Sequence, residues 1–84
     1  MLNKKPKVEI YSKPDCCLCD EAKAVLNEVQ REIDFDLVEI DIRRDSQLFD
    51  TYKERIPIGF INGKTAFKYR IDKEKLRLQL TSIR

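Results

Sequence analysis

The sequence predicts an α/β protein in which a four-stranded mixed sheet is flanked by three helices, in the order β-α-β-α-β-β-α. Three observations predict this class. A short strand pattern leads into a long helical pattern and then into a second strand pattern, as in a parallel β-α-β unit. Asn62-Gly63 separates two further strand patterns, as in a two-residue hairpin. The 84 residues suffice for a single domain, over residues 1–84.

The first strand and the first helix follow from hydrophobic periodicity. In Lys7–Ser12, apolar and more polar residues alternate, and a proline lies on each side of the segment. From Cys17 to about Ile33, apolar residues recur at intervals of three and four, which is typical of an amphipathic helix. We expect Asp15, just before this helix, to cap it.

The middle of the chain predicts a second strand and a short helix. The segment Phe35–Ile42 reads as a strand, but its alternation changes phase midway, which indicates a bulge or a misplaced strand end. Asp45 or Ser46 can cap the helix that follows. Its inward-facing residues are expected to be Leu48, Phe49 and Tyr52. It must stop near Arg55, because the residue before Pro57 disfavours helical backbone angles.

The last third of the chain predicts a hairpin and a closing helix. Asn62-Gly63 readily adopts the positive φ angles of a type I′ turn, and it lies between the strand patterns "PIGFI" and "KTAFKY". Asp72 can cap the final helix. The apolar side of this helix is expected to contain Leu76, Leu80 and Ile83.

The composition is that of a soluble folded domain. Hydrophobic residues make up 42% and charged residues 38%, and basic and acidic residues are interleaved to a formal charge of +2. This balance gives no basis for nucleic acid or a membrane as a partner. No apolar run is long enough for a signal peptide or a membrane span, so we expect a cytoplasmic monomer. The absence of histidine excludes mechanisms that need an imidazole from this chain.

Three cysteines lie within four positions, where the first strand leads into the first helix. Cys16 and Cys19 are three residues apart, so on a helical turn they share a face and can form a disulfide, whereas Cys17 projects elsewhere. The helix N-terminus favours a thiolate, which is the attacking species in disulfide exchange. We expect Cys16, at the exposed start, to attack and Cys19, one turn deeper, to resolve the mixed disulfide. Cys17 is expected to be a bystander.

Two other interpretations of the cluster stay open at this point. A zinc site would need a ligand from outside the chain or from a second copy, because three sulfurs without a histidine fall short of the four ligands of a structural zinc site. Alternatively, the cysteines are packed as small hydrophobic residues without a chemical role. Metal analysis and absorbance of protein purified without oxygen would identify a metal-binding module.

Two segments of the sequence resemble glutaredoxin-like proteins of the thioredoxin superfamily. "VEIYSKPDCCLCDEA" is similar to the opening strand of glutaredoxins and their C-x-x-C motif. "RIPIGFINGK" is similar to the later segment in which a cis-proline opens the third strand. The likeness is closest to a small glutaredoxin-like group with C-x-L-C-D-E-A in the first helix. It covers almost the whole chain and implies a thioredoxin-like fold.

The resemblance also implies the residues of a site. Cys16 would be the nucleophile and Cys19 the resolving thiol. The bond between Ile56 and Pro57 would be cis, and the Ile56 backbone would pair with a bound peptide or with glutathione. Lys13 matches a lysine that contacts a glutathione carboxylate in glutaredoxins.

We therefore expect a thiol-disulfide oxidoreductase, an enzyme that exchanges electrons between its C-x-x-C pair and protein or low-molecular-weight disulfides. An external thiol reductant would restore the dithiol, with glutathione as a candidate co-substrate and no metal or organic cofactor. The sequence departs from the family at Cys17-Leu18, between the cysteines, and at Phe67-Lys68, near an expected glycine pair. The missing glycines argue against efficient glutathione use, because they would let the backbone approach glutathione closely. The alternatives are a zinc or iron-sulfur module and a thioredoxin-fold binding module without turnover.

Overall fold

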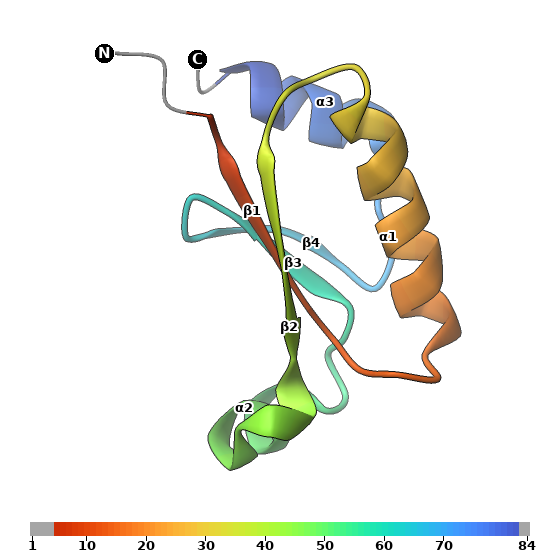
Figure 1. The fold of residues 1–84 in the computed structure, drawn as a ribbon, viewed down its shortest axis with the longest axis vertical. Helices are drawn as coiled ribbons and strands as arrows, with labels where there is room; N and C mark the ends of the chain where they lie inside the picture. The colour runs from red at the N-terminus through yellow and green to blue at the C-terminus, as the bar shows by residue number, and fades with distance from the viewer. Residues whose placement is uncertain (1–4, 83–84) are drawn as a thin grey trace.

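The computed structural model describes residues 5–82, which form a four-stranded mixed sheet with three helices (Figure 1). The strands are β1 (Lys7–Ser12), β2 (Asp36–Asp41), β3 (Ile58–Ile61) and β4 (Lys64–Lys68). The helices are α1 (Cys17–Gln30), α2 (Ser46–Tyr52) and α3 (Lys73–Ser82), with a short 3-10 helix, Ile42–Arg44, before α2. The α/β class and the order of the elements are those predicted from the sequence. Within the described range, no helix has the length and apolar content that a membrane crossing needs.

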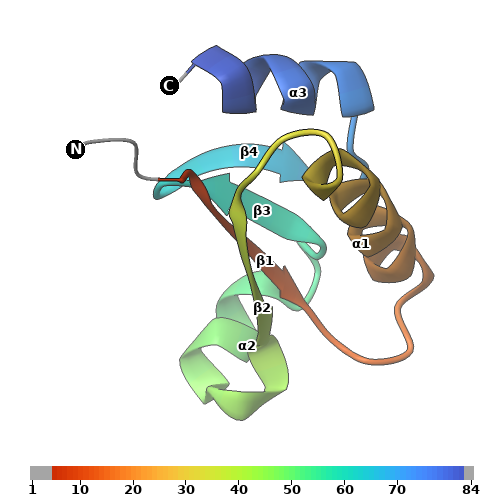
Figure 2. The ribbon, with the colours of Figure 1, turned by 45° about the horizontal axis from the view of Figure 1, so that its top comes forward.

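The sheet has the strand order β2-β1-β3-β4. β1 pairs in parallel with β2 and antiparallel with β3, and β3 pairs antiparallel with β4. Because α1 connects the two parallel strands, β1 and β2 end at the same edge of the sheet. α1 and α3 cover one face, and α2 lies beyond the ends of β1 and β2 (Figure 2). The start of α1 and the helix α2 therefore lie at the same end of the molecule.

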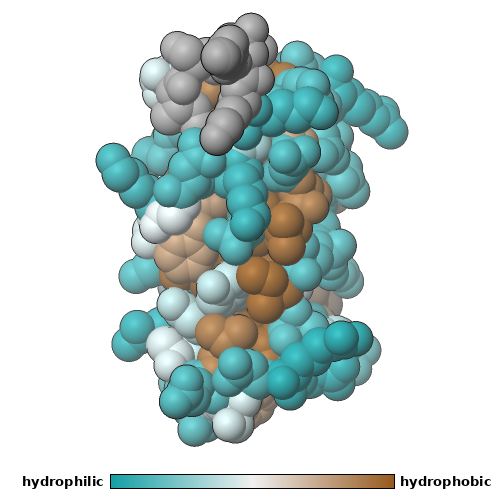
Figure 3. Space-filling model, turned by 60° about the vertical axis from the view of Figure 1, so that its left-hand side comes forward, coloured by the Kyte–Doolittle hydropathy of each residue, from teal (hydrophilic) through white to brown (hydrophobic). Residues whose placement is uncertain are grey.

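The main core lies between the sheet and the helices α1 and α3. Val8 and Ile10 of β1 and Leu26 of α1 are among its fully buried residues. The other buried residues of this core are Ala22, Val29, Phe35, Ile61, Phe67, Leu76 and Leu80. On the opposite face of the sheet, apolar patches lie among hydrophilic side chains (Figure 3).

Both ends of α1 differ from the prediction. The N-cap is Cys16 and not Asp15. Cys16 has the extended backbone typical of a cap, with φ −112° and ψ 109°, whereas Asp15 has a left-handed φ of +63° and turns the chain. The helix ends at Gln30 and does not reach Ile33, because the next residues form a turn onto the Val29 carbonyl.

The phase slip in the second strand is not a bulge. β2 stays in continuous parallel register with β1 along its whole length. It is an edge strand with partly exposed residues on both faces, so its alternation is weak. Phe35 and Ile42, predicted as its ends, lie just outside it. The irregularity of this sheet occurs instead between β3 and β4, at Gly59 and Phe60.

The short helix and the hairpin form as predicted, with small shifts in their ends. Asp45 caps α2 through hydrogen bonds from the first helical N–H groups to its carboxylate. The helix ends at Tyr52, a few residues before Arg55. Asn62 and Gly63 have φ of +50° and +88°, the positive values that a type I′ turn requires.

The final helix also has the predicted cap. The Asp72 carboxylate accepts the backbone N–H of Lys75 at 3.2 Å, which satisfies one of the free N–H groups at the start of α3. Leu76 and Leu80 face the main core, as the periodicity predicts. Ile83, predicted on the same side, lies outside the described residues.

Candidate redox site

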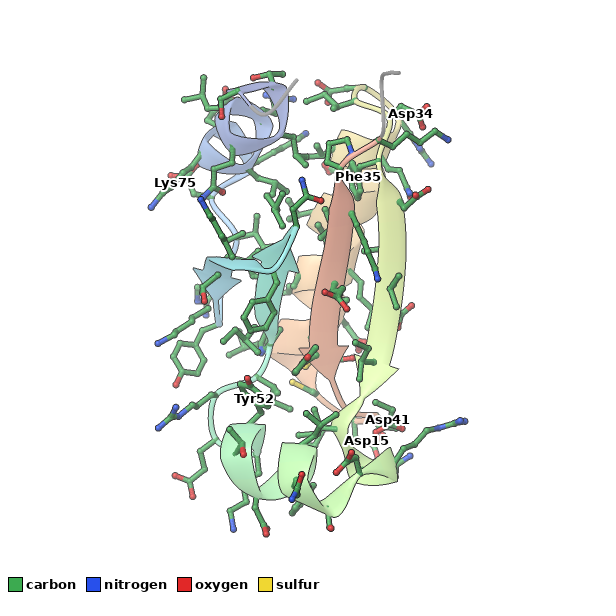
Figure 4. The ribbon with its side chains drawn as sticks, turned by 90° about the vertical axis from the view of Figure 1, so that its left-hand side faces the viewer. Asp15, Asp34, Phe35, Asp41, Tyr52 and Lys75 are labelled. Atoms are coloured by element: carbon green, nitrogen blue, oxygen red, sulfur yellow. The ribbon has the colours of Figure 1, made fainter. Side chains whose placement is uncertain are left out.

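The cysteines lie where β1 leads into α1, at the end of the sheet that α2 also occupies. Figure 4 shows Asp15, just before Cys16, and Tyr52 of α2 at this end. Cys16 is the N-cap of α1, and its Sγ accepts a hydrogen bond from the backbone N–H of Cys19 at 3.2 Å. A sulfur in this position faces free N–H groups and the positive end of the helix dipole, and both favour negative charge. The residue that caps the helix is thus the candidate nucleophile itself.

The three thiols are all free, and they differ in how far they are buried. Cys19 is completely buried (0% exposed), Cys16 is half-buried, and Cys17 is exposed. A bulky disulfide can reach Cys16 but not Cys19. The structure is therefore compatible with attack by Cys16 and resolution by Cys19, and these two roles stay predictions.

The pKa of the Cys19 thiol is raised from the ordinary 9.0 to about 11. Burial away from water is the largest cause, followed by the hydrogen bond with Cys16, because both stabilise the neutral thiol. A hydrogen bond from the Lys13 backbone and the charge of Lys23 lower the pKa, but to a smaller extent. Cys19 is therefore protonated near neutral pH.

In the folded protein, we expect Cys19 to react with iodoacetamide roughly a hundredfold more slowly than in the unfolded chain near neutral pH. Only the thiolate reacts, and a pKa raised from 9.0 to about 11 lowers the thiolate fraction by about that factor. Because the unfolded chain loses this proton first, the thiol also makes folding less favourable as pH rises from 9.0 to about 11.

Pulsed alkylation followed by tandem mass spectrometry measures each thiol separately. Exposed Cys17 serves as the internal control. The rate at Cys19 should rise about tenfold per pH unit until the pKa is approached. Equal rates at Cys17 and Cys19 in the folded protein would contradict the expected protection.

A second, smaller core surrounds Cys19. Cys19 packs there with Ile42 and Ile56. The side chains packed against these three are Tyr11, Cys16, Leu48, Phe49 and Tyr52. Three of them belong to α2, so the inward face predicted for that helix forms one wall of the site. The fold thereby brings Ile56, from the segment before β3, next to the cysteines.

The segment before β3 contains a cis peptide bond and backbone groups without hydrogen-bond partners among residues 5–82. The peptide bond between Ile56 and Pro57 is cis. Among the hydrogen bonds of residues 5–82, none uses the backbone N–H or C=O of Ile56. The Ile56 side chain is only 7% exposed and packs in the same small core as Cys19, so these unpaired groups lie near the thiols.

Tyr69 is a residue of this region that sequence reasoning missed. Its backbone N–H donates to the Pro57 carbonyl at 2.6 Å, and its hydroxyl donates to the Glu54 carbonyl at 3.0 Å. It therefore ties the end of β4 to the loop before β3. Its φ is +64°, and 43% of the residue is exposed. No sequence signal marks it, since its partners are far away along the chain.

The charged residues near the cysteines are partly paired. Glu21 lies 3.4 Å from Arg70, and Lys23 lies 3.0 Å from Glu39. Lys13 is half-buried, and its backbone contributes to the environment of Cys19, whereas contact of its ammonium group with a substrate stays a prediction. Within residues 5–82, no three acidic or cysteine side chains form a group that could hold a metal ion.

Comparisons with known proteins agree with this architecture. The model of the "Glutaredoxin-like domain (DUF836)" family matches residues 7–81. The chain is 35% identical over 82 residues to "Glutaredoxin-like protein YDR286C homolog" of Dictyostelium discoideum, covering 90% of this chain and 76% of that protein. It is also similar to the solution structure of protein Ne2328 from Nitrosomonas europaea, with 27% identity, a TM-score of 0.80, and coverage of 95% of this chain and 96% of that one.

A more distant structure shows the wider fold. A mutant thioredoxin from Halobacterium salinarum superimposes with a TM-score of 0.65 at 18% identity, covering 94% of this chain and 74% of the thioredoxin. At this identity the likeness concerns the fold alone. This likeness and the mixed sheet of order β2-β1-β3-β4 show that the chain has the thioredoxin fold. The family match over residues 7–81 shows that the chain belongs to the glutaredoxin-like domain family.

Proposed function

We propose that the protein is a thiol-disulfide oxidoreductase of protein or low-molecular-weight disulfides. The Cys16 thiolate attacks one sulfur of the substrate disulfide, and the other sulfur leaves as a thiolate and takes up a proton. Cys19 loses its proton and attacks the Cys16 sulfur of the mixed disulfide, and the second substrate thiol is released. The substrate disulfide is reduced to two thiols, and the two cysteines are oxidised to one disulfide.

One observation carries this proposal: the Cys16 sulfur caps α1 and accepts the N–H of Cys19 at 3.2 Å. The two residues are one helical turn apart, one half-buried and one buried. A helix N-terminus stabilises a thiolate at its cap, and the Cys16 thiolate is the attacking species in the first step. Because its pKa is raised, Cys19 stays a neutral thiol while Cys16 attacks, and it reacts only after the mixed disulfide has formed.

The segment before β3 supplies the substrate position in this proposal. The unpaired N–H and C=O of Ile56 can pair with an extended peptide in a short antiparallel arrangement. Lys13 is the cation proposed to meet a substrate carboxylate. An external thiol reductant, with glutathione as a candidate, restores the dithiol, so we place the reaction in the cytoplasm, where such thiols are reduced. Neither a metal nor an organic cofactor takes part.

Titration of the protein against a glutathione redox buffer tests the proposed function. We expect a single two-electron transition with a midpoint potential in the range of glutaredoxins, roughly −200 to −230 mV. Peptide mapping of the oxidised form should find the bond between Cys16 and Cys19. A bond between Cys16 and Cys17, or a protein that remains a mixture of free thiols under oxidising conditions, would refute the assigned roles.

A further inference from the structure

Five basic residues are distributed along the surface between the candidate site and α3. They are Lys53, Arg55, Lys68, Arg70 and Lys75, named the basic surface below, and all are exposed. They come from the loop after α2, the end of β4 and the first turn of α3. Tyr69 holds the first two segments together through its hydrogen bonds to Glu54 and Pro57. Lys53 and Arg55 are close to Ile56 in the chain, and Lys68 is paired with Ile58 across the hairpin. Arg70 and Lys75 lie farther towards α3 and line the same cleft as Lys68.

Most of these charges have no partner within residues 5–82. Only Arg70 forms an ion pair, with Glu21, and the two side chains are 74% and 62% exposed. Such an exposed pair contributes little, so a ligand carboxylate can replace Glu21. The acidic residues in the same segments are Glu54, Asp72 and Glu74. Glu74 forms an ion pair with Arg77, and the Asp72 carboxylate accepts the backbone N–H of Lys75. The five basic residues outnumber these acidic ones, so the region has a net positive charge, on a chain whose formal charge is +2.

Part of the basic surface borders a cleft between β4 and α3. The cleft has a volume of about 240 Å³, and its charged lining consists of three basic residues and one acidic residue: Lys68, Arg70, Lys75 and Asp72. Its apolar lining includes Phe67, Ile71 and Leu76. A cleft with an apolar lining and basic side chains suits a peptide segment that combines hydrophobic and acidic residues.

We propose that the basic surface recognises an acidic segment of a protein disulfide substrate. This inference rests on the proposed function and names the class of its substrate. A strand paired with the Ile56 backbone would continue past Arg55 or Lys68, where positive charge accelerates the association of acidic partners. Exposed Asp15 and Asp20, which flank Cys16 in the chain, disfavour acidic residues directly beside the reacting cysteine. The acidic segment is therefore set apart from the substrate disulfide.

Two peptide disulfides of equal length test the proposal, one with glutamates and one with lysines several residues from the cysteine. We expect kcat/KM for the acidic peptide to be at least about tenfold higher at low ionic strength. The difference should shrink in 1 M salt, where the Debye length falls to about 3 Å. Copies of both peptides with serine in place of cysteine measure binding alone, and a small neutral disulfide measures exchange alone.

Charge reversal locates the effect. The variant Lys53→Glu/Arg55→Glu/Lys68→Glu should reverse the preference, with each rate expressed relative to the same variant's rate for the neutral disulfide. The matched control Lys5→Glu/Arg31→Glu/Lys64→Glu changes the net charge equally at the opposite end of the sheet, and it should retain the preference for the acidic peptide. Circular dichroism verifies that both variants are folded.

Three results would decide against one of the two proposals. Equal kcat/KM for the acidic and the basic peptide would overturn the basic surface as a recognition site. A loss of preference as large in the control as in the surface variant would overturn it as well. Preferential binding of the acidic serine peptide, without exchange of any disulfide, would support the basic surface and refute the proposed oxidoreductase function.

Discussion

Replacing Cys16 with serine (Cys16→Ser) is expected to slow disulfide exchange by at least about a hundredfold. A serine hydroxyl does not ionise near neutral pH, and neither remaining thiol occupies the same position. Cys19 is 0% exposed, with a pKa raised to about 11. Cys17 is exposed but is the first residue of α1 and not its cap. Single-turnover mixing of the reduced protein with a small disulfide, followed by thiol release, measures the rate without any electron donor.

Two matched variants separate the roles of the cysteines. Cys19→Ser should still attack, but it should accumulate a mixed disulfide on Cys16, visible as an added mass in intact-protein mass spectrometry. Cys17→Ser should change the rate by less than about twofold, because the Cys17 side chain is exposed and belongs to neither hydrophobic core of the domain. A large loss of activity in Cys17→Ser, with full activity in Cys16→Ser, would show that the wrong thiol has been assigned as the nucleophile.

The substitution Gly59→Ala is expected to destabilise the domain by about 3 kcal/mol, a large part of the roughly 5–15 kcal/mol typical of small domains. Gly59 in β3 pairs with Phe67 in β4, and a Cβ atom on Gly59 would overlap the Phe67 ring. The ring is packed in the main core at 8% exposure, so it cannot move away without opening that core. Urea denaturation followed by circular dichroism measures the loss.

A second substitution distinguishes this clash from a general intolerance of change. Adding Phe67→Leu to Gly59→Ala should recover part of the lost stability. The free energy of unfolding of the double variant should fall by less than the sum of the decreases in the two single variants. Gly63→Ala is the control, because a Cβ there meets nothing within 4 Å and only its φ of +88° is unfavourable, at a cost of about 1 kcal/mol. A Gly59→Ala variant as stable as the parent would contradict the close contact with Phe67.

Local patterns in the sequence predicted the elements well, because helices, caps and tight turns depend on residues close together in the chain. The periodicity of α1 identified the side that faces the core, and Asp45, Asp72 and Asn62-Gly63 marked helix starts and a turn correctly. The error at Asp15 has the same origin. Aspartate is a common cap, and nothing local indicated that its backbone would turn with positive φ and leave the cap to Cys16.

The sequence predicted only some of the residues of the candidate site. Spacing selected Cys16 and Cys19, and a family resemblance pointed to Ile56 and Pro57. The contribution of Tyr69 could not be predicted, since its hydrogen bonds join segments with no common pattern. The basic surface could not be predicted either, because its five residues are interleaved with acidic ones in the sequence. They belong to the loop after α2, the end of β4 and α3, which are brought together only by folding.

By itself, then, the sequence determined the α/β class, the order of strands and helices, and the pair of cysteines at a helix start. Those properties arise from periodicity and spacing within a few residues. Only the tertiary structure decided that Cys19 is buried with a raised pKa, that unpaired backbone groups of Ile56 lie near it, and that positive charge gathers beside them. Burial, desolvation and long-range contact are properties of the assembled chain, and no single segment contains them.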